Sequence, residues 1–142
     1  MMTTIQVKRT TFKKMESEWY CYHETVREIA NLREEIMNPQ QEVDENTGGG
    51  RSGFISAPTE RIATGLVANK KLRYLTEIVT AIEEVYNALP DDYKRLVRTR
   101  YWSKGNELNW DGVSMRCNIS RRQAIVWRNQ IIQATIELLG WR

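Results

Sequence analysis

Apolar residues recur at steps of three and four along most of the 142-residue chain, and this spacing constrains its fold more than any other feature. Such spacing places apolar side chains on one face of an α-helix. Strict alternation of apolar and polar residues, which is typical of half-buried strands, is scarce. The sequence therefore predicts an all-α protein.

Two long helices are predicted in the N-terminal part. The first runs from about Thr11 to Met37, where Pro39 discourages further helix. Its apolar stripe consists of Phe12, Met15, Trp19, Tyr22, Val26, Ile29 and Ile36. The second runs from about Pro58 to Ala88. Its stripe consists of Ile62, Leu66, Asn69, Leu72, Leu75, Val79, Ile82, Val85 and Leu89.

Neither helix can bury its stripe alone, so we expect a long antiparallel hairpin or a coiled coil with a second copy of the chain. Asn69 lies on the stripe, where it either fixes the register of an oligomer or faces solvent. The connecting loop, residues 38–57, contains the run Gly48 to Gly50 followed by Arg51. Such a run either cradles a phosphate or serves as a flexible connector. It lacks the strand and the Lys-Ser/Thr of a P-loop, so we interpret it as a connector.

Charge is distributed unevenly along the chain. The net charge is only +3, but the segment from Lys94 to Arg142 carries ten basic residues against three acidic ones. The segment from Met15 to Glu60 has an acidic excess. This asymmetry suggests that one half binds nucleic acid and the other has a different role, although a solvated basic surface is the simpler alternative.

Other features exclude several classes of function. No run approaches the ~20 apolar residues of a membrane helix, and no signal peptide is recognisable, so we expect a cytoplasmic protein that does not enter a membrane. Cys21, Cys117 and His23 stand apart and suggest neither a disulfide framework nor a metal site. No phosphate-binding loop, nucleophile elbow or zinc-protease motif is present. We therefore expect no enzyme, no cofactor and no metal.

The C-terminal part predicts three further helices. Pro90, followed by two aspartates, begins the first of them, whose inner face is Leu96, Val97 and Tyr101. Asn109 can cap a short helix that ends at Cys117. The turn that follows consists of Asn118, which tolerates a left-handed backbone, then the apolar Ile119 and the N-cap Ser120.

The last helix, Arg121 to Leu139, has two chemically different faces. The inner face is predicted to contain Ala124, Trp127, Ile131, either Ala134 or Thr135, and Leu138. Arginine can pair with guanine, glutamine or asparagine with adenine, and apolar side chains with a thymine methyl. We therefore expect a helix-turn-helix from about Asn109 to Leu139. Its predicted DNA-binding residues are Ser120, Arg121, Arg122, Gln123, Ile125, Arg128 and Asn129, with Val126 on the same outer face. An ordinary helical hairpin with a basic face is the alternative.

These residues resemble known families. The segment from Leu89 to Leu139, which includes LPDDYKRLVRTRYW and NWDGVSMRCNISRRQAIVWRNQI, is similar to region 4 of sigma-70-type factors. From about Tyr20 to Trp141 the chain resembles the RinA family of phage transcriptional activators. The resemblance rests on YHETVREIANLREEIM, DENTGGGRSGFISAPTERIA and SRRQAIVWR.

The resemblance implies a sequence-specific regulator that binds double-stranded DNA and activates phage late or packaging genes in the cytoplasm of a bacterial host. It also implies contact with the host RNA polymerase or with a second protomer, and we expect a dimer. Residues 1–88 would be an oligomerisation or interaction region, and residues 89–142 the DNA-binding domain, with Lys94, Arg95, Arg98 and Arg100 near the DNA backbone.

Two other functions are compatible with these residues. A small terminase subunit also joins a helix-turn-helix to an oligomerisation region and recognises viral DNA for packaging, although the order of the two parts here argues against it. Alternatively, the basic helix binds an acidic protein.

Overall fold

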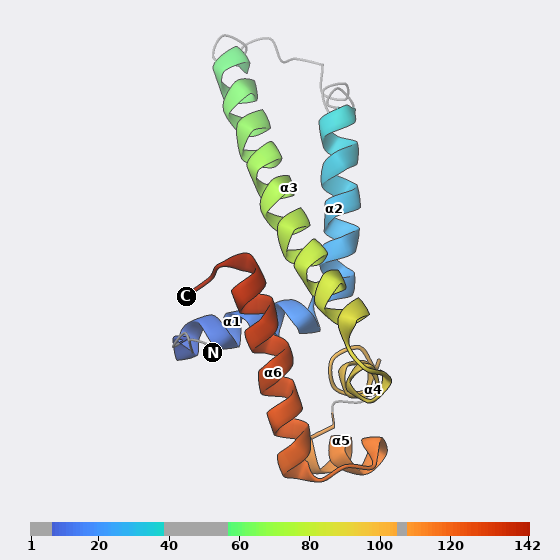
Figure 1. Cartoon of the computed structure of the whole chain (residues 1–142). Helices are drawn as coiled ribbons and strands as arrows, with labels where there is room; N and C mark the ends of the chain where they lie inside the picture. The colour runs from blue at the N-terminus through green and yellow to red at the C-terminus, as the bar shows by residue number, and fades with distance from the viewer. Residues whose placement is uncertain (1–6, 39–56, 105–107) are drawn as a thin grey trace. The chain divides into compact units, whose positions relative to one another are not determined.

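The computed structural model describes residues 7–38, 57–104 and 108–142, and all its regular elements are α-helices (Figure 1). The predicted all-α class is thus confirmed for this part of the chain. The helices are α1 (Arg9–Tyr20), α2 (Tyr22–Met37), α3 (Ala57–Ala88), α4 (Asp91–Arg100), α5 (Trp110–Cys117) and α6 (Arg121–Leu139). The connector at residues 39–56, with its glycine run, and the side chain of Ile62 lie outside the described residues.

The chain divides into two compact units. The larger unit combines the N-terminal segment through Tyr22 with the segment from Ile78 to Arg142, and the smaller unit is His23–Glu77. The predicted border between residues 88 and 89 lies elsewhere: α1 and the end of α3 belong with the C-terminal helices. The reason is packing, because α1 and α3 contribute apolar side chains to the core around α6.

The core of the larger unit contains side chains from α1, α3, α4, α5 and α6. The members with almost no exposed surface are Met15, Trp19, Ile78, Ile82, Leu96, Val97, Val113, Ala124, Ile131, Ile132 and Ile136. Burying each large apolar side chain contributes roughly 1.5–3 kcal/mol. α6 therefore has a firmly packed face, which determines the residues that it leaves at the surface.

The single helix predicted from Thr11 to Met37 is interrupted at Cys21, which separates α1 from α2. In an uninterrupted helix the Trp19 carbonyl would accept the amide of residue 23. Here the Trp102 indole Nε1 donates to that carbonyl at 2.9 Å. Within α2, Val26 is 39% exposed whereas Thr25 is buried together with Ile29 and Leu32. The prediction of a continuous stripe is wrong at this point.

In the smaller unit, α2 lies alongside α3 (Figure 1). Lys71 Nζ and Glu28 Oε2 pair across the two helices at 2.9 Å, between half-exposed side chains. The predicted stripe of α3 does not hold throughout. Leu66 is 66% exposed, and Asn69 is exposed and donates to the Gly65 carbonyl of its own helix at 2.9 Å. Exposure in a single protomer is compatible with both interpretations of Asn69, as a residue that fixes the register of an oligomer and as a solvent-facing one.

Candidate nucleic-acid interface

The turn between α5 and α6 has the predicted local geometry. Asn109 Oδ1 accepts the Gly112 amide at 2.8 Å and caps α5. Asn118 adopts the left-handed conformation, with φ of 62°. Ser120 Oγ accepts the Gln123 amide at 3.0 Å and caps α6. Each cap binds an amide three residues further along the chain, and Asn118 sets only its own torsion, so the sequence alone was sufficient to predict these features.

The buried face of α6 follows the prediction in its first half. Ala124 and Ile131 are buried, and the half-buried Trp127 stacks on Tyr93, with ring centroids 4.2 Å apart. Thr135 rather than Ala134 faces inward, because its hydroxyl accepts the Trp19 indole N–H at 3.2 Å.

The prediction for the end of α6 is wrong at one position. Leu138, which was assigned to the inner face, is 52% exposed. The core is completed instead by Ile132 and Ile136, which are fully buried in the same helix.

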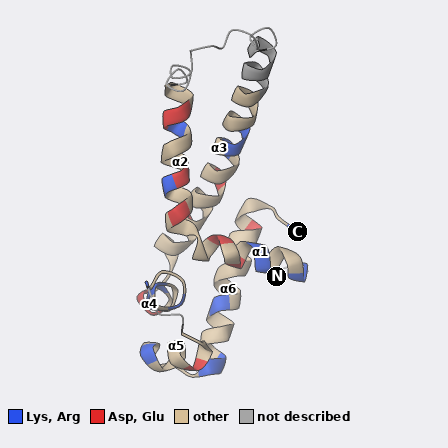
Figure 2. Cartoon of the chain, turned by 180° about the vertical axis from the view of Figure 1, so that it is seen from behind, with Lys and Arg blue, Asp and Glu red and all other residues tan. Residues whose placement is uncertain are grey.

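The first turns of α6 present the predicted polar residues to solvent. Ser120, Arg121, Arg122, Gln123 and Asn129 are exposed. Among the apolar outer residues, Val126 is exposed and Ile125 half-buried. Figure 2 shows basic residues at α5 and at the beginning of α6.

One ion pair restrains this surface only weakly. Arg121 Nε lies 3.4 Å from Asp111 Oδ1, between side chains that are largely exposed. Exposed pairs of this kind contribute ~0–1 kcal/mol. Arg121 can therefore exchange this partner for another anion at little cost.

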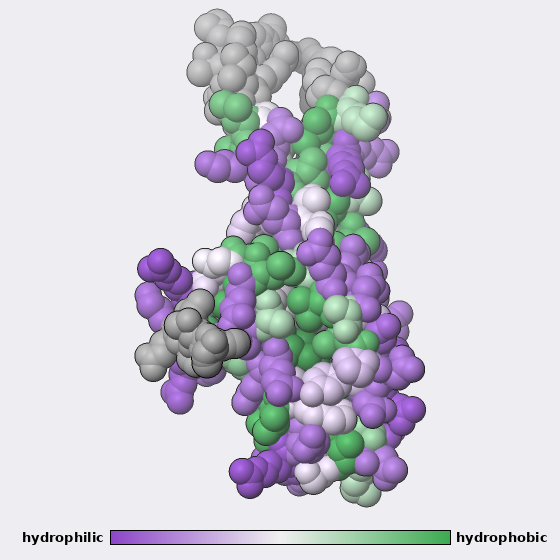
Figure 3. Space-filling view, in the orientation of Figure 1, coloured by the Kyte–Doolittle hydropathy of each residue, from purple (hydrophilic) through white to green (hydrophobic). Residues whose placement is uncertain are grey.

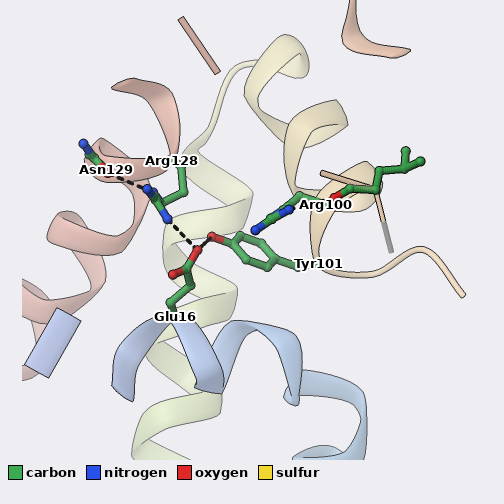
Figure 4. Close-up of polar contacts among 6 residues, drawn as sticks. Glu16, Arg100, Tyr101, Arg128 and Asn129 are labelled. Atoms are coloured by element: carbon green, nitrogen blue, oxygen red, sulfur yellow. Dashed lines mark hydrogen bonds and ion pairs between the residues drawn. The ribbon is translucent and has the colours of Figure 1, made fainter. Parts of the chain in front are cut away.

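Arg128 does not lie on the exposed face, and its predicted orientation is wrong. Its guanidinium donates from NH1 to Glu16 Oε2 at 2.8 Å and from Nε to Asn129 Oδ1 at 2.8 Å (Figure 4). The side chains of the Glu16 pair are only 17% and 15% exposed. The rings of Phe12 and Trp110 lie within 5.2 Å and 5.0 Å of the guanidinium. The partner glutamate is 112 residues away in sequence, so local pattern could not reveal it.

Glu16 has a second donor. The hydroxyl of Tyr101 donates to the same Oε2 at 2.7 Å (Figure 4). Burial, reinforced by the charge of Glu16, raises the pKa of Tyr101, so that the phenol stays protonated and remains a donor. Glu16 thereby ties α1 to the end of α4 and to the middle of α6.

Three of the four basic residues expected near the DNA backbone contact the protein itself. Arg100 is half-buried, donates to the Leu108 carbonyl at 2.8 Å and lies 4.1 Å from the Trp110 ring. Arg98 donates to the Tyr86 hydroxyl at 3.0 Å, and Lys94 lies over the same ring at 5.4 Å. Arg95 is exposed. Arg100 is therefore a structural residue of the α4–α5 junction.

Sequence reasoning missed two exposed residues in the last turn of α5, beside the turn that leads to α6. Arg116 is exposed in the last turn, and Met115 is 78% exposed beside it. The positions of Val113 and Cys117, both buried, would have placed Arg116 on the outer face of a helix that directly precedes the turn. Arg116 therefore extends the basic surface formed by the first turn of α6.

Other chemistry finds little support in the part of the chain that the structure describes. Cys117 is buried and Cys21 half-buried. Among the described residues, no group of three or more histidine, cysteine or acidic side chains could hold a metal ion. Within the same residues, no helix is both long and apolar enough to cross a membrane.

Comparison with known proteins supports the expected resemblance. The chain is 27% identical over 134 residues to the protein named Transcriptional activator rinA from Staphylococcus phage phi11, and the match covers 94% of each chain. The similarity to the RinA family expected from the sequence motifs is thereby confirmed. No solved structure matches the chain significantly. A family model described as "Protein of unknown function (DUF722)" matches residues 17–137, most of the chain, and the protein therefore belongs to the DUF722 family.

Proposed function

We propose that the chain is a phage transcriptional regulator, an activator, that binds specific sequences of double-stranded DNA. One observation carries the proposal: Arg121, Arg122 and Gln123 are exposed in the first turn of a helix whose opposite face is firmly packed. The similarity to a protein named as a phage transcriptional activator supports the same function.

In this proposal the first half of α6 lies in the major groove of DNA. Arg121 and Arg122 pair with guanine edges and Gln123 with adenine, while Val126 contacts a thymine methyl. The Ser120 hydroxyl accepts a hydrogen bond from the Gln123 amide only. The amides of the two arginines therefore remain at the positive end of the helix, where they can hold a DNA phosphate.

The remaining predicted residues have lesser or different roles. Asn129 is exposed near the edge of the contact surface, and its Oδ1 already accepts from Arg128. Ile125 is half-buried and contributes only the part of its side chain that reaches the surface. Arg128 sets the position of α6 against α1 through Glu16 rather than touching DNA.

A single small DNA-binding module makes few contacts, so a dimer is physically favourable for specific binding. We propose that the smaller unit pairs two protomers, and that the activator also contacts the host RNA polymerase. Sedimentation equilibrium tests the pairing: a monomer at all protein concentrations would contradict it.

The decisive experiment measures DNA affinity by fluorescence anisotropy, using duplexes from the region that flanks the gene of this protein. If each arginine makes a bidentate base contact, Arg121→Ala and Arg122→Ala each cost ~1–3 kcal/mol of binding free energy. The matched control is Arg33→Ala with Arg73→Ala, which removes two exposed arginines from the smaller unit. The proposal would be refuted if the variant that carries both Arg121→Ala and Arg122→Ala bound DNA as tightly as the control and the unaltered protein do.

A further inference from the structure

A second surface of the larger unit lies far from the proposed DNA contacts. It is an open groove of about 600 Å³ between the end of α3 and the end of α6. The residues that line this α3–α6 groove are Glu84, Val85, Ala88, Leu89, Ala134, Glu137 and Leu138. Figure 3 shows hydrophobic side chains gathered over these parts of the two helices.

The groove is apolar inside and acidic at its rim. Five of its seven lining residues are aliphatic, and Leu138 is 52% exposed although a leucine at this point of the helix was expected in the core. The two polar lining residues are both glutamates, and both are exposed. Glu137 accepts from the neutral amide of Gln133 in its own helix at 3.1 Å, and within the described part of the chain no Lys or Arg forms an ion pair with it.

The helix ends add to this negative potential. Both α3 and α6 end beside the groove, and the last turn of a helix carries a partial negative charge. Neither last turn contains a basic residue that would offset that charge. The nearby cations Lys94 and Arg98 contact the ring and hydroxyl of Tyr86, which is not a lining residue.

We propose that the α3–α6 groove is a docking site for an amphipathic helix of another protein, one that presents leucine-like side chains flanked by lysine or arginine. The apolar floor would take up the aliphatic side chains, as helix-in-groove complexes do. The two glutamates and the helix ends would attract the flanking cations and set the orientation of the bound helix.

A second copy of the chain is a poorer occupant. Symmetric pairing through the groove would bring Glu84 and Glu137 close to the same residues of the partner, and like charges repel across such an interface. A small polar ligand is also a poor match, because the groove offers it only two carboxylates of the same charge.

Docking at the groove leaves the proposed DNA-binding residues accessible. Leu138 follows Arg122 by sixteen positions in α6, which corresponds to roughly 24 Å along a helix. The groove and the start of α6 can thus be occupied at the same time. The proposal does not depend on DNA binding, and the two are tested separately.

The test uses the full chain and two synthetic helical peptides, each labelled with a fluorophore. Both carry leucines at helical spacing; one has lysines beside them and the other has glutamates at the same positions. We expect the lysine peptide to bind at least tenfold more tightly. Leu138→Ser should weaken its binding roughly tenfold, since the apolar contact is lost. Glu84→Lys with Glu137→Lys should reverse the preference between the peptides.

Matched controls lie in the smaller unit, at exposed positions of the same residue types. Leu66→Ser and Glu34→Lys with Glu35→Lys should leave peptide binding unchanged. Circular dichroism checks that each variant is folded, and Glu137→Gln, which changes no side-chain volume, replaces the charge reversal if that variant unfolds. DNA affinity is measured for each groove variant and should not change.

Three outcomes would overturn the docking site: no binding of the lysine peptide, equal binding of the two peptides, or binding that the groove variants do not alter. A change of oligomeric state in Leu138→Ser would identify a second copy as the occupant and would also refute the proposal. Peptide binding without DNA binding would leave the groove proposal standing and refute the proposed function alone.

Discussion

At the scale of single residues, Glu16 links three helices. One of its carboxylate oxygens accepts from both Tyr101 and Arg128, at 2.7 and 2.8 Å, in a largely buried position. Removing Glu16 would take this acceptor from the Tyr101 phenol and would leave Arg128 with only its bond to Asn129, and such a loss in a largely buried position costs more than the pair itself contributes. The position of α6 therefore depends on a residue near the opposite end of the chain.

Glu16→Ala should lower the free energy of unfolding by about 1–3 kcal/mol, because it leaves a phenol and a guanidinium partly unsatisfied. Urea unfolding followed by circular dichroism measures this change. Glu28→Ala is the matched control, since its half-exposed pair with Lys71 should contribute ~0–1 kcal/mol. If Arg128→Ala weakens DNA binding without lowering stability, Arg128 contacts DNA and its positioning role is wrong.

Tyr22 should make the folded state less stable at alkaline pH. Burial, together with the hydrogen bond to Glu83 at 2.5 Å, raises its pKa to about 12 from the ordinary 10.0. A folded pKa above the unfolded one gives stability that is complete below pH 10 and is lost as the pH rises towards 12.

Between about pH 10 and 12 the free energy of unfolding of the unaltered protein should therefore fall relative to that of Tyr22→Phe. From about pH 7 to 9 the difference between the two free energies should stay constant. Unfolding curves in urea across this pH range provide the measurement. A difference that stays the same up to pH 12 would contradict the role assigned to Tyr22.

At the scale of elements, the accuracy of sequence-based prediction depends on the range of the interactions. The bounds of α6 and the α5–α6 turn were predictable, since Asn109, Asn118 and Ser120 act on amides or torsions in their own neighbourhood. The interruption at Cys21 was not predictable, because it accompanies a hydrogen bond from Trp102, which is 83 residues away from Trp19. Helical periodicity contains no information about such contacts.

The turn itself can be tested at Asn118. Its φ of 62° is unfavourable for residues with a branched side chain, and Asn118→Val should cost ~1–2 kcal/mol of stability. Asn118→Gly should be neutral or slightly stabilising, because glycine adopts this conformation without a steric cost. Thermal unfolding compares the three proteins. A valine variant as stable as the glycine variant would show that the turn does not need a left-handed residue.

At the scale of the whole molecule, the sequence reveals charge better than it reveals domain borders. The uneven distribution of basic residues was visible directly, and it points to the end of the chain that contains Arg121 and Arg122. The assignment of α1 to the larger unit was not visible, since it depends on Met15 and Trp19 packing against helices more than 60 residues away. Which basic residues remain exposed also depends on tertiary contacts, as Arg100 and Arg128 demonstrate.

The charges that remain exposed predict how binding should respond to salt. Each phosphate neutralised by a protein cation releases counterions, so the logarithm of DNA affinity falls linearly with the logarithm of salt concentration. Arg116 is exposed at the end of α5, beside the turn that leads to α6, and is suited to a phosphate rather than a base. Arg116→Ala should weaken binding to all sequences equally and reduce the salt slope by about 1.

Arg122→Ala should instead relax the preference for one base pair, because a base contact discriminates and a phosphate contact does not. Anisotropy titrations from low to high salt, on specific and scrambled duplexes, distinguish the two effects. If Arg116→Ala changed sequence preference and left the slope unaltered, the orientation of α6 in the groove would have to be reversed, with α5 reading the bases.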